Sequence, residues 1–413
     1  MKLTEEQEAV LGGERGDLLA RYLEWSILWG EALGATRLVP VTNVHCILRT
    51  PCLKGISERT LDTYLDEFRE LCRHRVKCVT LTHANCTDLA ALREKGLTEK
   101  ELNFQQELHA LAAGAGVKAT WSCAPYQVGA VPAFGEICAW TESSAVVYSN
   151  SMMGARTNRN GMESSLAAAF LGWVPEFGAL LDRNRKAAVR VELRVKMNSV
   201  SDWGALGYHV GEKAGSGIPV FEGIEEIAPA EAKQLSASLP YAGRGTTMFH
   251  IAGLTPEAPT AEEALDPDQP IESLTFDRDD LRTTYRKMNR MEKGEPIDTV
   301  ALGCPFSSLD ELREISQVLA RRQVAPGVKL IVCTSRHTLV DARRRGYAGV
   351  IEEAGGHILS DICPGALGHA RPRNYVSNSF KQAFYGRSAL ASRTGVLPLE
   401  GCVAAAVSGR WAG

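Results

Sequence analysis

Short apolar runs alternate with amphipathic segments along most of the chain. Residues 57–74 and 99–116 carry apolar side chains at helical spacing, the first after a serine suited to an N-cap and the second ending at glycine. The apolar runs of strand type lie at 36–42, 76–82 and 117–123. Strands that alternate with helices in this way are typical of βαβ units and parallel sheets.

The same alternation continues to the end of the chain. One or two helices are expected in 4–34, and two strand–loop–helix units close the sequence. The Pro- and acid-rich segment 255–272 is predicted to be a linker or a surface excursion. The fold class is therefore α/β, with several domains and largely parallel sheets. The approximate subdomains are 1–130, 131–290 and 291–413.

Composition narrows the class of protein. A chain of 413 residues is long enough for two or three domains, and its 45% hydrophobic and 23% charged residues are ordinary for a globular protein. A net charge of −3 argues against nucleic-acid or membrane-surface partners. The start, MKLTEEQEAV, is acidic and unlike a signal peptide, and no apolar run approaches the roughly 20 residues of a membrane span. We expect a protein of the reducing cytoplasm.

Three of the 11 cysteines stand out by position. The total is odd and no CxxC pair is present, so a disulfide framework or zinc ribbon is not expected, and most of the thiols should be buried. Cys123, Cys304 and Cys363, in contrast, stand at expected strand ends or in loops, where α/β sheets bind ligands. Three thiolates can hold an iron–sulfur cluster and leave one iron open as a Lewis acid. The alternative is three incidental or buried thiols.

A long polar block, residues 139–175, offers a second candidate. Its AVVY is expected to be a short strand, SNSMMGARTNRNG (149–161) a loop, and MESSLAAAFLG a helix ended by glycine. The loop has two guanidinium groups suited to carboxylate or phosphate, Arg156 and Arg159. Its neutral donors are Ser149, Asn150, Ser151, Thr157 and Asn158. Such a loop either binds an anion or is a well-bonded structural turn.

Other polar residues follow expected strands. His45 is a candidate base or substrate donor, or a hydrogen-bonded structural residue. Arg336 and Lys381 are candidate anion anchors, or ordinary charges near helix starts. GxSxG, P-loop, HExxH and complete GxGxxG motifs are absent, which leaves hydrolase, nucleotide and zinc-protease chemistry without support.

The block AWTESSAVVYSNSMMGARTNRNG resembles the signature of the aconitase X family. FHIAGLTPEAPT, GCPFSSLDEL, CTSR and SNSFKQAFY extend the resemblance over nearly the whole chain in family order. The resemblance implies an aconitase-like architecture, with several α/β domains around an iron–sulfur site. It also implies that Cys123, Cys304 and Cys363 bind the cluster, of either the 2Fe-2S or the 4Fe-4S type.

The resemblance further implies a mobile swivel domain that carries a serine base. No such domain is evident in the sequence, so we expect a large subunit that works with a separate small swivel subunit. The known activities of the family are dehydration of mevalonate 5-phosphate and of cis-3-hydroxy-L-proline. Departures at THANCTD, at HCIL and at Phe306 favour the hydroxyproline, which would yield a pyrroline-2-carboxylate.

The expected enzyme is thus a hydro-lyase for a small hydroxy acid. Candidate catalytic residues are Ser149, Arg156, Lys381 and His45. Candidate substrate-binding residues are Asn150, Ser151, Thr157, Asn158, Arg159 and Arg336. A cluster-containing sensor subunit without turnover, or a catalytically dead scaffold, is the alternative from another functional class.

Overall fold

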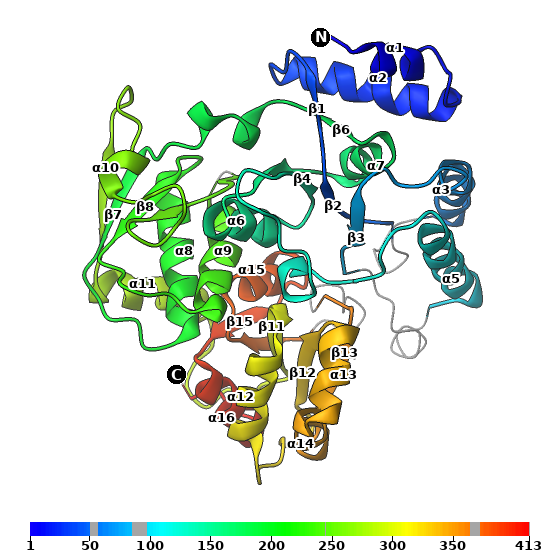
Figure 1. The fold of residues 1–413 in the computed structure, drawn as a ribbon. Helices are drawn as coiled ribbons and strands as arrows, with labels where there is room; N and C mark the ends of the chain where they lie inside the picture. Colours follow the sequence, from blue (N-terminus) through cyan, green and yellow to red (C-terminus); the bar gives the residue numbers. More distant parts are fainter. Residues whose placement is uncertain (50–56, 85–96, 244, 364–371, 413) are drawn as a thin grey trace.

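Three α/β units, each built on its own parallel sheet, make up the molecule (Figure 1). The computed structural model describes residues 1–49, 57–84, 97–243, 245–363 and 372–412. In Figure 1 the second unit is the green part at the left and the third the yellow-to-red part at the bottom. No helix among the described residues is long and apolar enough to cross a membrane.

The first unit has strand order β3-β2-β4-β5, with all pairs parallel. Its strands are β2 (Asn43–Cys46), β3 (Val79–Thr82), β4 (Ile137–Trp140) and β5 (Arg156–Arg159). Its helices are α1 (Glu5–Leu11), α2 (Asp17–Ala32), α3 (Glu58–Leu71), α5 (Glu99–Gly114), α6 (Ser143–Met152) and α7 (Met162–Leu171). An antiparallel pair, β1 (Leu38–Pro40) and β6 (Trp173–Pro175), lies outside this sheet.

The second unit has strand order β10-β7-β8-β9, again parallel. Its strands are β7 (Val189–Leu193), β8 (Pro219–Glu222), β9 (His250–Ile251) and β10 (Glu272–Phe276). Its helices are α8 (Val200–Ala214), α9 (Pro229–Ala242), α10 (Ala261–Ala264) and α11 (Arg278–Met288). Segment 255–272 leads from β9 at one edge of this sheet to β10 at the other, so it lies within the unit and does not link two units.

The third unit has strand order β13-β12-β11-β14-β15, also parallel. Its strands are β11 (Thr299–Ser307), β12 (Lys329–Thr334), β13 (Gly356–Ser360), β14 (Asn374–Ser377) and β15 (Arg393–Val396). Its helices are α12 (Leu309–Leu319), α13 (Arg336–Arg344), α14 (Tyr347–Glu353), α15 (Phe380–Ser388) and α16 (Leu399–Ser408). The α/β class with largely parallel sheets is confirmed. Of the approximate subdomain limits, the one at residue 130 falls within the range of the first sheet, and the one at 290 falls between the second and third sheets.

Helix starts follow the local capping chemistry of the sequence. Ser57 caps α3 through the backbone N–H of Thr60, and Ser308 forms a capping box with Glu311 at the start of α12. Such caps satisfy amide groups that have no partner within the helix. The expected strand 117–123 is wrong, because only Lys118 pairs there, in an isolated bridge to Leu81.

The polar block 139–175 folds differently from its prediction. Residues 143–152 form α6 where a short strand and a loop were expected, and 156–159 form β5. Every residue of α6 from Ser143 to Ser151 is buried, so the segment lacks the polar face that reveals a helix in a sequence. Its paired valines also favour a strand when read locally. The following helix, α7, ends at Gly172 as predicted.

Two glycines allow α8 and α9 to pack with their backbones close together. A Cβ at Gly211 would lie 2.4 Å from the carbonyl oxygen of Leu239, and one at Gly207 would lie 2.7 Å from that of Leu235. Neither contact leaves room for a methyl group without a shift of one backbone. This close pairing places α9, whose side chains reach the other two units.

We therefore expect Gly211→Ala to lower the stability by about 1–3 kcal/mol, because it overpacks this contact. The control is Gly349→Ala in α14, where nothing lies within 4 Å of the added Cβ. That variant should gain about 0.5–1 kcal/mol from helix propensity. Thermal unfolding midpoints measure both, and shifts of the same sign would contradict the packing argument.

Candidate functional site

The carboxyl ends of the first and third sheets face one central region. His83 follows β3 and Glu142 follows β4 in the first unit, while Lys381 follows β14 in the third. Contacts between Lys381 and Glu142 and between Phe306 and Cys123 join the two edges. Parallel sheets bind ligands at their carboxyl ends, so the candidate site lies here.

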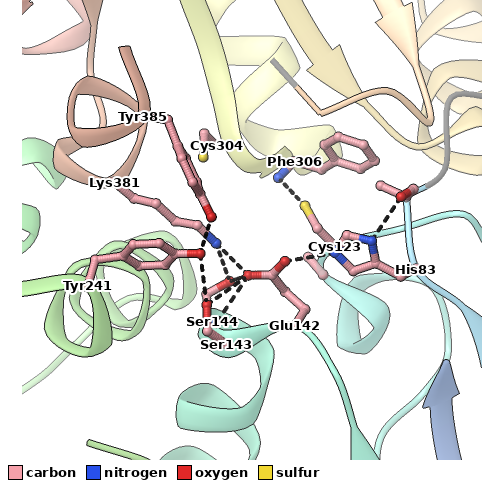
Figure 2. A network of polar contacts seen from close by, with 12 residues as sticks. His83, Cys123, Glu142, Ser143, Ser144, Tyr241, Cys304, Phe306, Lys381 and Tyr385 are labelled. Carbon is pink, nitrogen blue, oxygen red and sulfur yellow. Dashed lines mark hydrogen bonds and ion pairs between the residues drawn. The ribbon is translucent and has the colours of Figure 1, made fainter. Parts of the chain in front are cut away.

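Glu142 lies at the middle of this region (Figure 2). Its Oε1 accepts hydrogen bonds from the Ser144 N–H at 3.3 Å, the Ser144 hydroxyl at 3.0 Å and the Lys381 ammonium. Its Oε2 lies 2.7 Å from Nε2 of His83. Burial alone would raise the pKa of Glu142, but Lys381 and His83 outweigh it and hold that pKa well below its usual range. The side chain is therefore a carboxylate that also caps α6.

Lys381 is the buried cation of the site, with 4% of its side chain exposed. It donates to Glu142 and, at 3.3 Å, to the Ser144 hydroxyl. Its Nζ also lies 4.8 Å from the centre of the Tyr241 ring. Burial would lower the pKa of Lys381, yet Glu142 and Tyr241 hold it well above its ordinary value. A permanent positive charge therefore lies beside the thiols of the site.

Two tyrosines extend the network to the second unit. The hydroxyl groups of Tyr241 on α9 and Tyr385 on α15 are hydrogen-bonded to each other, and the Ser143 hydroxyl donates to Tyr241 at 3.2 Å. Figure 2 shows both phenol oxygens pointing toward the Lys381 ammonium. All three units thus supply side chains to one polar centre.

The three predicted ligand cysteines lie near this centre. The backbone N–H of Phe306 donates to Cys123 Sγ at 3.2 Å, which joins the segment that holds Cys304 to the one that holds Cys123. A charge on Cys363 acts on both of the other thiols, and those two act on each other. Cys304 lies within β11 and not after it as predicted, at an irregular stretch between Leu302 and Ser307.

Burial sets the protonation of these thiols. It raises the pKa of Cys123 to about 12 and that of Cys304 well above the ordinary value, while Lys381 acts in the opposite direction on both. Among the described residues, no three His, Cys, Asp or Glu side chains are arranged to hold a single metal ion. A cluster of several atoms spans a wider space than one ion, so thiolates farther apart than the ligands of a single ion can bind it.

Two other predicted residues have clear surroundings. His45 is fully buried in β2, and its Nε2 lies 2.9 Å from the carbonyl oxygen of Ser122. Burial and the neighbouring His83 lower the pKa of His45 to about 3, so its ring is neutral. Arg336 begins α13 and is paired with the buried carboxylate of Asp361, which also accepts from the Arg336 backbone N–H at 2.8 Å.

The candidate residues of segment 149–161, called the polar run below, lie along β5 and at the C-terminal end of α6. Arg156 starts β5 at the amino edge of the sheet and bonds Leu180 O and Asp182, while Arg159 ends β5 at the carboxyl edge and is exposed. The other five side chains are hydrogen-bonded to backbone groups: Ser149 to Val146, Asn150 to Thr157 and Thr247, Ser151 to Phe249, Thr157 to Trp140 and Asn158, and Asn158 to Phe177 and Ala179. Their predicted contact with substrate stays a prediction.

Several residues of the network were not singled out in the sequence. Glu142 precedes two serines after an apolar strand, which is a recognisable N-cap pattern. Tyr385 lies four residues after Lys381 and therefore on the same helix face. His83 is the first residue after β3, at a strand end with other polar residues. Tyr241 has no local signal, because only the packing of α9 brings it to the site.

Three parallel-sheet units with a site at their meeting point define the architecture of aconitase-type proteins. Models of the Aconitase X first, second and third domains match residues 1–183, 187–286 and 297–408. The chain belongs to the aconitase X family, as the signature indicated. An iron–sulfur cluster is general in aconitase-like proteins.

Relatives of known activity match almost the whole chain. The phosphomevalonate dehydratase large subunit of Thermococcus kodakarensis is 33% identical over 94% of this chain and 95% of its own length. The cis-3-hydroxy-L-proline dehydratase of Hypocrea jecorina is 30% identical over 98% of this chain and 69% of its own length. The crystal structure of Thermococcus kodakaraensis aconitase X in its holo-form matches with a TM-score of 0.83 and 31% identity, over 97% of this chain and 98% of that one. The relatives are dehydratases, and this chain is a hydro-lyase.

The buried ion pair predicts an asymmetric response to substitution. Lys381→Met should lower the stability by about 3–5 kcal/mol, because it leaves the Glu142 carboxylate buried without its cation. Adding Glu142→Gln should restore part of that loss, since the amide oxygen can still cap α6. Thermal unfolding of the two single variants and the double variant measures these stability losses.

The matched control is the exposed pair of Lys287 and Glu212. Lys287→Met should change the stability by only about 0–1 kcal/mol. Strictly additive losses at Lys381 and Glu142 would show that the pair is not energetically coupled.

His45 predicts a pH dependence of stability. Its pKa is about 3 in the folded chain against the ordinary 6.5, so the unfolded chain binds the extra proton between these values. The stability should therefore decrease as the pH is lowered below 6.5. The slope of this decrease approaches about 1.4 kcal/mol per pH unit for this one group. His45→Phe should remove this contribution, which amounts to about 2 kcal/mol between pH 7 and pH 5. Exposed His357→Phe should not, and equal slopes for the native chain and His45→Phe would disprove the assignment.

Proposed function

We propose that this chain is the cluster-bearing large subunit of a dehydratase for a small hydroxy acid. The observation that carries the proposal is the buried Lys381–Glu142 pair, together with the hydrogen bond from the Phe306 N–H to Cys123 Sγ, which joins the segment of Cys304 to that of Cys123. The proposed partner is a separate small swivel subunit with a serine base, and a small-subunit partner is supported by the name 'large subunit' of the phosphomevalonate dehydratase relatives. Its docking completes the site.

The three thiols are the proposed ligands of an iron–sulfur cluster, of either the two-iron or the four-iron type. They fit the group by chemistry, because each is a soft donor, and a charge on Lys381 favours the thiolate forms of the buried Cys123 and Cys304. When bound, such a cluster supplies a Lewis acid for the departing hydroxyl group. Because burial favours the protonated thiols, binding must release their protons.

Lys381 is the proposed catalytic residue of this chain. Two of its three N–H donors have described partners, Glu142 and Ser144, and the third is assigned to the substrate carboxylate. Removal of a proton beside that carboxylate builds up negative charge, which a fixed ammonium in a buried site stabilises. Glu142 holds the ammonium in place. In the hydrogen-bonded pair of Tyr241 and Tyr385, one hydroxyl donates to the other, and the proton of the accepting hydroxyl is a further donor toward the substrate.

The polar run is proposed to support this site more than to bind substrate. Ser149, Asn150, Ser151, Thr157 and Asn158 join α6 and β5 to their neighbours and so fix the helix that Glu142 caps. Arg159, at the carboxyl edge, is the member of the run best placed for an anion, and Arg156 is the least well placed. His45 contributes a neutral ring behind His83, 5.4 Å away between ring centres.

The proposed substrate is cis-3-hydroxy-L-proline. The site cation Lys381 is paired with the Glu142 carboxylate, and Arg336 with that of Asp361, which suits one substrate carboxylate better than a phosphate dianion. The second candidate is mevalonate 5-phosphate. It is favoured by identities of 30–35% to five phosphomevalonate dehydratase large subunits, against 29–30% to two hydroxyproline enzymes.

The experiment is anaerobic co-purification with the small subunit, followed by assays on both compounds. We expect turnover of cis-3-hydroxy-L-proline, and loss of both the cluster absorbance and the activity in Cys304→Ala. Turnover of mevalonate 5-phosphate alone would show that it, and not cis-3-hydroxy-L-proline, is the substrate. Turnover of neither with an intact cluster would favour a sensor subunit and contradict the dehydratase proposal.

The matched control for the cysteine variant is Cys402→Ala. Cys402 is as buried as Cys304, but it lies in the core of the third unit, where its thiol donates to the carbonyl oxygen of Leu397 at 3.4 Å. This variant should retain cluster and activity. Full cluster absorbance in Cys304→Ala would remove Cys304 from the ligand set.

A further inference from the structure

Helix α9 of the second unit holds the backbone of the segment that carries Cys304. Gln234 Nε2 donates to the carbonyl oxygen of Cys304 at 3.1 Å, and Lys233 Nζ donates to that of Phe306 at 2.9 Å. Both side chains are at most 2% exposed. The ammonium of Lys233 is also paired with Glu311 of α12. Two consecutive residues of one unit therefore bind two carbonyl groups of another.

Between these two carbonyls lies the amide that contacts the other thiol. The Phe306 N–H donates to Cys123 Sγ at 3.2 Å, as the dashed line in Figure 2 shows. The orientation of this N–H is set by the peptide plane, since the peptide unit is rigid. This peptide unit contains the Pro305 carbonyl and lies between the two peptide units whose carbonyls α9 holds, so restraining both neighbours restricts its rotation and keeps the N–H directed at the sulfur.

Side-chain packing supports one face of the segment. The Phe306 ring packs with Cys123, Ile331 and Cys333 on that face. On another face lies a cavity of about 210 Å³, lined by Gly303, Pro305, Ser307 and Gln234 among others. A strand end beside a cavity has room to shift, so hydrogen bonds from α9 determine its position more than side-chain contacts do.

We propose that Gln234 and Lys233 are positioning residues for the metal centre: through the Cys304 segment they hold the Phe306 N–H on the Cys123 thiolate. This inference rests on the proposed function, because it takes Cys123 as a cluster ligand. An N–H donor stabilises negative charge on a ligand sulfur and stabilises the reduced cluster more than the oxidised one. Hydrogen bonds to the sulfurs are accordingly among the factors that set the reduction potential of a cluster.

The test compares reduction potentials of the reconstituted full-length chain. Gln234→Leu removes the donor to Cys304, and Gln234→Glu keeps the shape while replacing the amide donor by an acceptor. We expect both to decrease the equilibrium constant for one-electron reduction, by up to about tenfold, which corresponds to about 59 mV. Potentials come from a dye-mediated titration followed by electron paramagnetic resonance, with iron per chain measured in parallel.

Lys233 is tested together with its carboxylate. The double variant Lys233→Met/Glu311→Gln avoids a buried unpaired charge, and it should lower the potential in the same direction. The control is Ser236→Ala on the same helix, whose hydroxyl donates to the carbonyl oxygen of Ala232 within α9. It should leave the potential and the iron content unchanged.

The outcomes separate the two proposals. If the native chain binds no cluster, the proposed function fails before any variant is compared. If the native chain binds a cluster and the folded Gln234 variants keep its potential and iron content, the positioning role is wrong. If Ser236→Ala shifts the potential as far as Gln234→Leu does, the effect belongs to α9 in general, and the specific contacts are again ruled out.

Discussion

A buried ion pair between residues 239 positions apart is the contact on which this architecture depends. Glu142 belongs to the first unit and Lys381 to the third, and each needs the other because neither charge is tolerated alone in a buried place. Lys381 stands in the first turn of α15, where the helix dipole disfavours a cation. The carboxylate of Glu142 offsets that cost while it caps α6, where an anion is favoured.

The same ion pair also contacts the second unit. Tyr241 reaches the ammonium from α9, and its neighbours on that helix, Lys233 and Gln234, bind the Cys304 segment. The three sheets therefore converge on polar contacts as well as on hydrophobic cores. A polar centre constrains relative position more narrowly than apolar packing does, because hydrogen bonds require defined distances and directions. Such a centre suits a site whose ligands come from separate units.

The sequence predicted the parts of this structure that depend on local chemistry. The amphipathic period and serine cap of α3, the capping box of α12 and the glycine that ends α7 all lie in short stretches of chain. Helix α6 was mistaken because burial on all sides removed its period. The three thiols were proposed from expected strand ends together with the family signature, and two of those strand ends differ in the structure, since 117–123 is not a strand and Cys304 lies within β11.

Other features depend on tertiary structure and have no local signal. Tyr241 reaches the site only because two glycines let α8 and α9 approach, and Arg156 lies at the amino edge because of the pairing of β5 with β4. The polar run looked like a ligand loop since donors that bond backbone groups and donors that bind anions are the same residue types. Only the hydrogen-bond partners distinguish the two uses.

The most direct measurement is an iron anomalous difference map of the anaerobically reconstituted protein in complex with its small subunit. We expect one compact iron peak bounded by the sulfur atoms of Cys123, Cys304 and Cys363, near the Lys381 ammonium. Iron bound by other residues, or a fully reconstituted protein without iron at these thiols, would contradict this expectation.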